Sequence, residues 1–335
     1  MVEGAPRIHL LSIPTPFPVG PVNVYLIEGE PVTLVDVGPL TDEALEALKT
    51  GLRQLGYSLP DIQQVVITHA HHDHFGQARR VVEESGATLL SFRANKQPLQ
   101  EFDTWWEDRV SYVADLVLEE GAPRKALREM EVIRSFARYA TSVPAVQTLE
   151  DEDEVLMGGF KWVALHTPGH ALGHLCFYHP QSQFLLSGDH LLRDITSNPV
   201  LETPREGMPD RPRSLPHYVR SLRRIRELDV RKVFPGHGEP VYDHRPLVDE
   251  ILTHHAMRAR LILQLLREQD CTVYELGVSL FGGELPGVEL FLVMSEIIGH
   301  LDILEMDGKV RRVESDGRAV WTATYPQWAP ASTIV

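Results

Sequence analysis

The sequence predicts an α/β protein (α+β in some classifications) whose functional side chains lie on loops that leave buried strands. Three observations support this class. Apolar runs of strand length recur along the chain, several of them end at a glycine-containing turn, and amphipathic helical patterns occur between and after them. Because open α/β sheets place their chemistry beyond the carboxyl ends of strands, functional residues are expected in these turns.

The first forty residues predict three strands. Ile8–Ile13 and Val22–Ile27 are expected to form a hairpin, with the Pro-rich stretch Pro14–Pro21 as the loop between them. A third strand is predicted at Val32–Val37, and it carries Asp36 near its end. The chain is therefore expected to begin with a strand, a long turn and two further strands.

A metal-binding pattern follows the next predicted strand, Ile62–Ile67. The residues after it contain H-x-H-x-D-H, which places four potential ligands within six residues: His69, His71, Asp73 and His74. Histidine and carboxylate suit zinc, iron or manganese. A polar loop with surface histidines is the alternative, but four ligand types directly after a strand favour a metal site.

Three later turns each present one more potential ligand. In every case an apolar run is followed by a glycine and by His or Asp, and any one of these residues alone is more often a turn residue or a helix cap. The three segments are Phe160–His166 followed by T-P-G-H with His170, Phe184–Leu186 followed by S-G-D with Asp189, and Val230–Phe234 followed by P-G-H-G with His237.

The order of these four motifs resembles that of the metallo-β-lactamase superfamily over residues 8 to about 245. The resemblance implies an αββα sandwich, in which two mixed sheets are covered by helices and a two-metal site lies on one edge between the sheets. The implied ligands are His69, His71 and His170 for the first metal, Asp73, His74 and His237 for the second, and Asp189 as the bridge. This set resembles that of dinuclear hydrolases of the glyoxalase II type.

The implied activity is that of a dinuclear metal-dependent hydrolase. Two divalent cations roughly 3.5 to 4 Å apart share a water and lower its pKa from about 15.7 toward about 7, so a bridging hydroxide is expected to attack the substrate. Zinc is the expected metal, with iron and manganese as alternatives. Asp73 is the candidate catalytic residue that returns a proton to the leaving group. His174 and His190 are candidates for supporting the ligands, or else are ordinary buried imidazoles.

Candidate substrate-binding residues lie on the Pro-rich loop and in two insertions. Phe17 on the loop either lines the substrate mouth or is a solvent-exposed aromatic. A helical insertion at about 96–145, with a break at Gly121, is interpreted as a lid over the metal cleft, with ordinary packing or a homodimer contact as the alternatives. The residues proposed to reach the substrate are Trp105, Trp106 and Tyr112 in this insertion, and Arg193, Asn198 and Arg205 in the Pro-rich stretch after Asp189.

The last part of the chain predicts a second domain, so the expected division is 1–246 and 247–335. Helical patterns at Leu247–Arg267, Val273–Phe281 and Val288–Met306 precede two strands joined through Ser315-Asp316-Gly317. This arrangement is typical of a winged helix. It also resembles the tail of a superfamily branch that includes β-lactamase-like protein 2, a single-strand endoribonuclease. The alternative function is therefore a phosphodiesterase or endoribonuclease acting on single-stranded RNA.

Composition argues against a nucleic-acid partner and favours a small-molecule substrate. The formal net charge is −15 and the pI about 5.5, whereas a nucleic-acid footprint requires clustered positive charge. The substrate is expected to be a small ester, thioester or lactone-like molecule. A third functional class is a metal-binding metabolite sensor without turnover. Such a sensor would keep the fold, but it would not need all seven predicted metal ligands.

The expected compartment is the cytoplasm. The first eighteen residues lack a basic flank followed by a long apolar core, and no apolar run reaches membrane-spanning length. Only Cys176 and Cys271 occur, so no disulfide framework is expected.

Overall fold

Two mixed β-sheets organise the first of two units into which the chain divides. The computed structural model describes residues 4–204, 210–283, 287–315 and 318–324. The first unit comprises Met1–Asp108, Arg134–Ser197 and His217–Asp249, and the second comprises Arg109–Ile133, Asn198–Pro216 and Glu250–Val335. The sheets and the candidate metal ligands all belong to the first unit.

The first sheet has six strands that lie side by side in chain order. Its first three strands are antiparallel, and the neighbours from the third to the sixth run parallel. The parallel part places the carboxyl ends of its strands at one edge of the sheet. The strands are β1 (Arg7–Ile13), β2 (Val22–Glu28), β3 (Thr33–Val35), β4 (Gln64–Ile67), β5 (Thr88–Phe92) and β6 (Gln147–Leu149).

The second sheet has five strands, ordered β11-β10-β9-β8-β7. Only the pair β10 and β11 is parallel, and the other neighbours are antiparallel. The parallel pair matters for function because both of its strands end in a candidate ligand turn. The strands are β7 (Glu154–Met157), β8 (Phe160–His166), β9 (Leu175–His179), β10 (Phe184–Gly188) and β11 (Lys232–Pro235).

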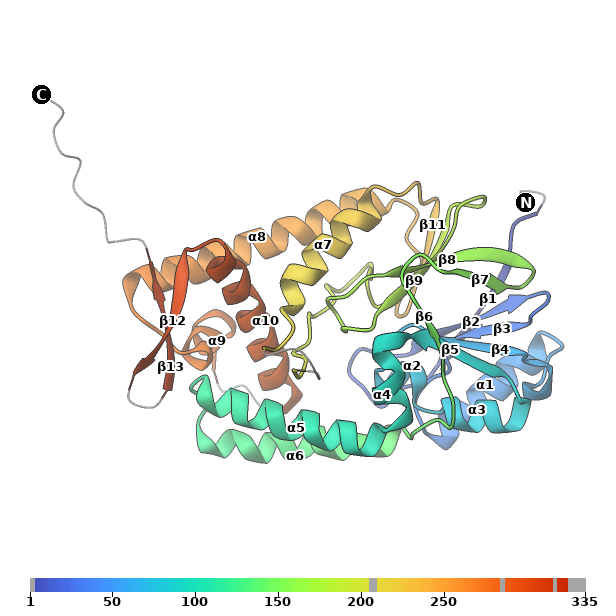
Figure 1. The fold of residues 1–335 in the computed structure, drawn as a ribbon, viewed down its shortest axis with the longest axis horizontal. Coiled ribbons are helices and arrows are strands. Elements are labelled where there is room, and N and C mark those ends of the chain that lie inside the picture. Colours follow the sequence, from blue (N-terminus) through green and yellow to red (C-terminus); the bar gives the residue numbers. More distant parts are fainter. Residues whose placement is uncertain (1–3, 205–209, 284–286, 316–317, 325–335) are drawn as a thin grey trace, which may run out of the picture. The chain divides into compact units, whose positions relative to one another are not determined.

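Helices cover the outer faces of both sheets, as Figure 1 shows for α1 and α3 beside the first sheet. Helix α1 begins where Thr41 accepts a hydrogen bond from the Ala44 amide, which is a typical N-cap. Within the first unit, α7 is joined to the turn after β8 by a 2.8 Å hydrogen bond from Ser221 to the Pro168 carbonyl. The predicted arrangement of two mixed sheets with helices is confirmed. The helices that lie wholly or partly in the first unit are α1 (Asp42–Gln54), α2 (His72–Phe75), α3 (Ala78–Ser85), α7 (Ser214–Arg226) and α8 (His244–Glu268), of which the start of α7 and most of α8 belong to the second unit.

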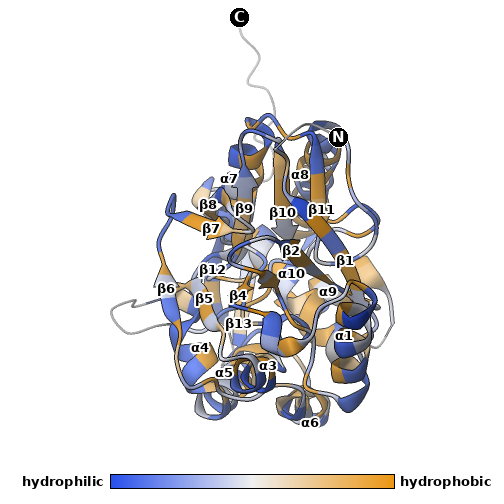
Figure 2. Cartoon of the chain, turned by 90° about the vertical axis from the view of Figure 1, so that its right-hand side faces the viewer, coloured by the Kyte–Doolittle hydropathy of each residue, from blue (hydrophilic) through white to orange (hydrophobic). Residues whose placement is uncertain are grey.

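The hydrophobic core lies between the two sheets. Side chains of the first sheet, such as Ile27 and Val66, share one cluster with Trp162 and Phe177 of the second. Figure 2 shows hydrophobic residues along several strands of both sheets, while helices such as α1 and α3 mix both colours, as expected for elements with one buried face. Because both sheets pack on one core, the ends of the strands that carry the candidate ligands lie at a common edge.

Phe177→Ala should lower the free energy of unfolding by about 3–5 kcal/mol, because it empties a site that is fully buried between the sheets. Urea denaturation followed by tryptophan fluorescence measures this loss. Leu156→Ala is the matched control, since Leu156 lies on β7 with 49% of its surface exposed. Equal losses for the two variants would contradict the assigned core.

The predicted helical insertion contains two long helices with the expected break between them. Helix α5 (Phe102–Glu119) ends two residues before Gly121, and α6 (Leu127–Arg134) follows. Helix α5 begins in the first unit and continues into the second. Short helical segments complete the connections: α4 (Lys96–Gln100), η1 (Leu59–Asp61), η2 (Arg93–Asn95), η3 (Arg124–Ala126) and η4 (Ser135–Tyr139).

The second unit contains the end of α8 followed by α9 (Val273–Phe281), α10 (Gly287–Met306) and the antiparallel pair β12 (Val310–Ser315) and β13 (Arg318–Ala323). Glu120 joins the end of α5 to this hairpin, because its carboxylate accepts hydrogen bonds from Arg312 Nε at 2.9 Å and Trp321 Nε1 at 3.0 Å. Asp316 and Gly317 of the predicted turn lie outside the described residues. No helix within the described ranges combines the length and apolarity needed to span a bilayer.

Candidate metal centre

Four strand ends of the first unit bring the seven predicted ligands together. His69 follows β4, and His71 is the N-cap of α2, the short helix that carries Asp73 and His74. His170 lies on the loop between β8 and β9, Asp189 directly follows β10, and His237 follows β11. The H-x-H-x-D-H segment therefore becomes a turn and a single helical turn, which directs His69 and His71 to one group of side chains and Asp73 and His74 to another.

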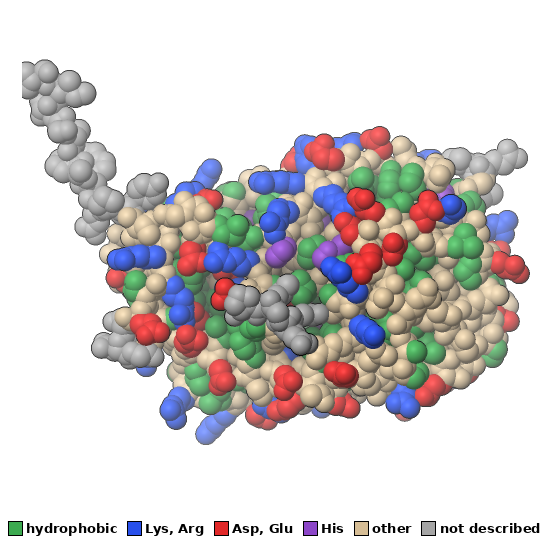
Figure 3. Space-filling view, viewed as in Figure 1, with side chains coloured by type: hydrophobic (Ala, Val, Ile, Leu, Met, Phe, Trp, Pro, Cys, Tyr) green, Lys and Arg blue, Asp and Glu red, His purple; other side chains and the backbone are tan. Residues whose placement is uncertain are grey.

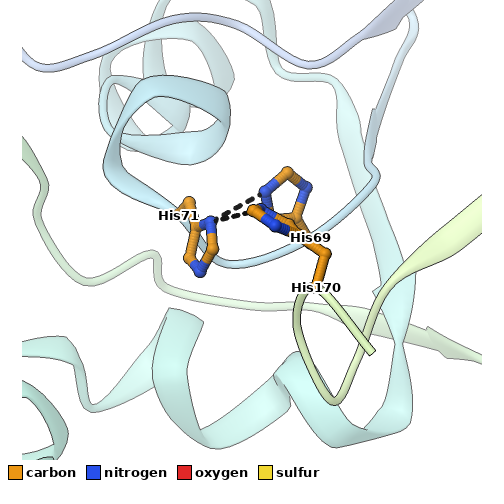
Figure 4. A group of neighbouring side chains, drawn as sticks. All are labelled: His69, His71 and His170. Atoms are coloured by element: carbon orange, nitrogen blue, oxygen red, sulfur yellow. Dashed lines mark hydrogen bonds between the residues drawn. The ribbon is translucent and has the colours of Figure 1, made fainter. Parts of the chain in front are cut away.

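The first group consists of His69, His71 and His170, whose ring nitrogens converge. His71 Nδ1 lies 3.0 Å from His69 Nε2 and 2.9 Å from His170 Nε2. Figure 4 shows the three rings directed toward one another, with His170 reaching in from the loop after β8. Three imidazole nitrogens facing one point form the kind of ligand set that zinc accepts.

The second group consists of Asp73, His74 and His237. His237 Nε2 lies 3.4 Å from Asp73 Oδ2, and His74 Nε2 lies 4.0 Å from Asp73 Oδ1. His74 is fully buried and Asp73 is nearly so. The group therefore combines two imidazoles with one carboxylate in a place that is largely shielded from water.

Asp189 connects the two groups. Its Oδ2 atom lies 3.6 Å from His170 Nε2 and 3.6 Å from His237 Nε2, which belong to different groups. Its Oδ1 atom lies 3.4 Å from His74 Nε2. The carboxylate is thus placed between the two sets of imidazoles, in the position that the family resemblance implies for a bridging ligand.

Hydrogen bonds on the far side of the rings orient four of the five histidines. In each case Nδ1 is engaged and Nε2 faces the centre, an arrangement that is common for metal-binding histidines. The Nδ1 partners are Thr68 Oγ1 for His69 at 3.0 Å, Asp36 Oδ2 for His74 at 2.8 Å, Ser197 Oγ for His170 at 2.8 Å and the Pro21 carbonyl for His237 at 2.8 Å. His71 differs, since its Nδ1 atom faces the other imidazoles.

Asp36 is a site residue to which the sequence analysis assigned no role. Its Oδ2 atom accepts hydrogen bonds from His74 Nδ1 and Thr68 Oγ1, each at 2.8 Å, and its Oδ1 atom accepts from the Thr68 amide at 2.8 Å. Asp36 has a φ of 59°, a left-handed conformation that Asp tolerates better than most residues. The sequence does contain a signal for this residue, because Asp36 directly follows β3, the neighbour of the ligand-bearing strand β4.

His174 holds the backbone of the bridging residue. Its Nε2 atom accepts a 3.1 Å hydrogen bond from the Asp189 amide, and its Nδ1 atom lies 2.9 Å from Thr167 Oγ1. His190 is also fully buried, and its ring packs 5.3 Å from that of Tyr218. Of these two predicted supporting residues, only His174 has a hydrogen bond to the candidate ligand Asp189 among the described contacts.

Close packing explains the first glycine of the P-G-H-G turn, Gly236. A Cβ atom at Gly236 would lie 2.2 Å from Asp189 Oδ1 and 2.9 Å from His74 Cε1, so no side chain fits there. Asn23 clamps the same turn, because its Nδ2 atom donates to the carbonyls of Pro235 at 3.0 Å and Gly238 at 2.8 Å. The turn that follows β11 therefore brings its backbone into close contact with the Asp189 carboxylate.

The charges of the centre stabilise ionised carboxylates. Burial opposes ionisation of Asp189 and Asp73, but the neighbouring His74 and His237 hold the pKa of both carboxyls below the usual range. Burial likewise opposes the charged form of His74, yet Asp189, Asp36 and Asp73 raise its pKa well above the usual value. Carboxylates gathered in this way attract positive charge, which protons or metal cations can supply.

The donor set fits divalent cations. Three buried atoms of the centre have no hydrogen-bond partner among the described residues: His74 Nε2, His237 Nε2 and Asp189 Oδ1. Buried polar atoms normally have a hydrogen-bond partner, so three atoms without one in the same centre indicate that a further group, such as a metal ion, binds there. Imidazole nitrogens and carboxylate oxygens are ligands for zinc, iron and manganese. The arrangement can therefore hold metal ions at both groups.

Aromatic side chains surround His72, which adjoins the ligand His71. Trp106 contacts the His72 ring edge-on with centroids 4.4 Å apart, and its Nε1 atom donates to the Arg134 carbonyl at 3.2 Å. Trp105 and Trp106 are both buried. Phe17 is half-buried and lies 6.3 Å from His72, between ring centroids. The tryptophans are therefore part of the packing beneath the centre, while Phe17 is partly open to solvent.

The other predicted substrate residues have different positions. Arg193 belongs to the first unit and is exposed, with its Nε atom 3.0 Å from Asp194 Oδ1. Tyr112 and Asn198 belong to the second unit, where Asn198 Nδ2 donates to the Leu292 carbonyl at 3.1 Å. Arg205 lies outside the described residues.

The family model described as "Metallo-beta-lactamase superfamily" matches residues 17–237. The chain therefore belongs to this superfamily, and it is a metal-dependent hydrolase. The sequence-based assignment of the family is confirmed.

Relatives of known sequence or structure extend the similarity beyond the catalytic region. "Probable metallo-hydrolase YqjP" of Bacillus subtilis is 36% identical over 301 residues, which cover 89% of this chain and 92% of that protein. "Beta-lactamase-like protein 2 homolog" of Caenorhabditis elegans is 27% identical over 259 residues, covering 77% and 69%. The crystal structure of metallo-beta-lactamase family protein TTHA1429 from Thermus thermophilus superimposes with a TM-score of 0.79 at 28% identity, covering 94% and 98%.

Proposed function

We propose that this protein is a dinuclear metal hydrolase of small esters, thioesters or lactone-like molecules. In this proposal His69, His71 and His170 hold one metal, Asp73, His74 and His237 hold the other, and Asp189 bridges them. Zinc is the proposed metal, with iron and manganese as alternatives. The proposal rests above all on Asp189, whose Oδ2 atom is equidistant, at 3.6 Å, from one imidazole of each group.

The chain's own residues would prepare the reaction. When bound, two divalent cations polarise the scissile group and lower the pKa of a shared water toward about 7. The ring orientations set by Thr68, Asp36 and Ser197 keep the imidazole nitrogens directed at the centre. Asp73 is kept ionised, so one of its carboxylate oxygens can accept a proton from the attacking water and return it to the leaving group.

A group of half-buried aromatics is the proposed wall for an apolar part of the substrate. The Phe17 ring packs edge-on against Phe136 and Tyr139, with centroids 5.4 and 5.3 Å apart, and it also approaches His72. Phe136 and Tyr139 come from the predicted insertion and Phe17 from the Pro-rich loop, so two segments that are distant in the sequence meet here. This group takes the substrate-binding role that the sequence analysis considered for Trp105 and Trp106.

Charge pairing makes a nucleic-acid substrate the weaker alternative. Two of the four arginines of α7 are paired with carboxylates: Arg224 with Asp151 at 2.8 Å and Arg226 with Asp249 at 2.6 Å. Basic and acidic side chains are interspersed on the face shown in Figure 3. The net charge of −15 opposes non-specific binding to RNA, because that binding depends on positive charge that replaces the counterions of the phosphates.

For the C-terminal part we propose a winged-helix-like domain at 247–335 that follows a catalytic domain at 1–246. The support is the order of α8, α9, α10 and the β12–β13 pair in the second unit. Its third helix carries Leu290 and Met294 as buried side chains, together with the acidic residue Glu289. We therefore propose that this helix packs within the protein instead of reading a nucleic acid.

A substrate panel tests the proposed function. Purified protein with its metal content measured would be assayed in parallel on an acyl thioester, an aryl ester, a lactone, a phosphodiester and single-stranded RNA. Turnover of a carbonyl substrate that is lost on chelation and restored by zinc, manganese or iron is the expected result. Metal-dependent turnover of the phosphodiester or RNA alone would instead establish the nuclease alternative, and metal binding without any turnover would favour a sensor.

A further inference from the structure

A second cluster of metal-ligand side chains lies in the second unit, apart in sequence from the candidate hydrolytic centre. It consists of His255 on α8 together with Glu296 and His300 on α10. One ring nitrogen of each histidine and one carboxylate oxygen of Glu296 all lie within 4.8 Å of one another. Glu296 and His300 are four residues apart, so they project from the same face of α10. We propose that this cluster is a zinc-binding site that joins α8 to α10.

The distance between the two imidazoles fits a shared metal. His255 Nδ1 lies 3.3 Å from His300 Nε2. Two nitrogens that are each about 2.0–2.1 Å from a tetrahedral zinc lie roughly 3.3 Å apart. The same distance is long for a hydrogen bond between nitrogens, because N–H donors in proteins usually approach their acceptors to about 2.9–3.0 Å. The pair is thus spaced as two ligands of one ion would be.

The opposite side of the His300 ring is held as in metal sites. His300 Nδ1 donates a 2.7 Å hydrogen bond to the Glu296 carbonyl, one helical turn earlier. This bond places the proton on Nδ1 and leaves a lone pair on Nε2, the atom that faces His255. Metal-binding histidines usually donate their other N–H to a carbonyl or carboxylate in this way, which fixes both the tautomer and the orientation of the ring.

Glu296 is a largely buried carboxyl group that has no Lys or Arg ion pair among the described residues, and burial raises its pKa to about 7. Its side chain is 12% exposed, and its Oε1 atom lies 3.7 Å from Nδ1 of the neutral His300 ring. The guanidinium of Arg258 lies over the Phe281 ring, 4.6 Å from its centroid, and its charge only partly offsets the effect of burial on the Glu296 pKa. Burial of a carboxylate is costly unless a cation or strong donors compensate for it. A divalent cation among the three side chains would provide that compensation.

Two histidines and one glutamate form a ligand set that zinc accepts with its fourth position open. His255 and His300 are buried at 2% and 0% exposure, so a zinc ion held by them would exchange slowly with solvent, and a water would complete its four ligands. The site would fasten two helices of the second unit, independently of whether the hydrolytic centre has the activity proposed above.

Zinc stoichiometry tests this proposal on the full-length protein. Equilibrium dialysis against buffered zinc, followed by elemental analysis, should find one fewer zinc per chain in Glu296→Gln than in the wild type. Glu296→Gln keeps the size of the side chain and removes its charge, so the fold should persist. Glu289→Gln, exposed on the same helix, and His254→Ala, exposed beside His255, are matched controls that should retain the wild-type amount.

Cobalt substitution provides a second measurement that does not depend on activity. The spectrum of the cobalt-loaded wild type minus that of Glu296→Gln should show visible bands of tetrahedral intensity, and zinc should raise the melting temperature of the wild type more than that of the variant. Equal zinc content in the wild type and Glu296→Gln would overturn the proposal. So would loss of one zinc from either control variant, since the lost metal would then not belong to this cluster.

Discussion

Asp189→Ala should abolish metal-dependent hydrolysis, with a fall in kcat/KM of at least about a thousandfold, or ~4 kcal/mol of transition-state stabilisation. The Asp189 carboxylate lies within 3.6 Å of ring nitrogens from both groups of histidines. Its removal leaves six imidazole and carboxylate ligands in two unconnected sets. We therefore expect the variant to hold less metal and to lose the shared position in which water would be activated.

Steady-state kinetics on the best substrate of the panel, with metal content measured on the same sample, tests this prediction. Asp194→Ala is the matched control, because Asp194 lies on the same loop but is exposed and pairs with Arg193. Circular dichroism should show that both variants keep the wild-type spectrum. Near-normal turnover by a folded Asp189→Ala variant would refute the bridging role.

The positions of the seven candidate ligands could be predicted because each follows an apolar run and a short turn. A buried strand constrains its neighbours in the sequence to be apolar, and a turn demands glycine, so both leave a local signal. Gly236 is an example: the space that a Cβ atom would occupy is taken by Asp189 and His74, and the turn motif reports this closeness. Strand β8 was predicted with its observed limits, Phe160–His166.

Other elements leave a weaker local signal. Strands β5 and β9 carry no ligand turn, and the sequence analysis did not identify them. Strand β4 was expected to begin at Ile62, but the 3-10 turn Leu59–Asp61 ends there and the first ladder residue is Gln64. Such limits depend on pairing with distant strands, which no short window of sequence contains.

The outer contacts of the ligands depend on tertiary structure even more strongly. Asp36 and His74 are 38 residues apart, and His237 is oriented by the carbonyl of Pro21, 216 residues away. Neither hydrogen bond can be predicted from the spacing of these residues in the sequence. The aromatic group of Phe17, Phe136 and Tyr139 is a similar case, since an exposed-loop residue acquires its neighbours only when the insertion folds against it.

Asp36→Asn should lower metal affinity or activity by about 10- to 100-fold, the usual cost of removing a carboxylate that orients a metal-binding histidine. Both oxygens of Asp36 accept hydrogen bonds: Oδ1 from the Thr68 amide, and Oδ2 from Thr68 Oγ1 and His74 Nδ1. An asparagine has one oxygen and one NH₂ group, so one of these donors must face another donor. Asn also tolerates the left-handed backbone at this position, which separates the effect of charge from backbone strain.

Metal titration by competition with a chromogenic chelator should show the weaker binding, and excess metal should restore a large part of the lost activity. Restoration distinguishes a positioning residue from a ligand, because Asp189→Ala lacks a ligand that excess metal cannot replace. Asp42→Asn serves as the control, since Asp42 is an exposed residue of the same unit. If Asp36→Asn bound metal as tightly as the wild type, the orientation of His74 would have to be set by packing alone.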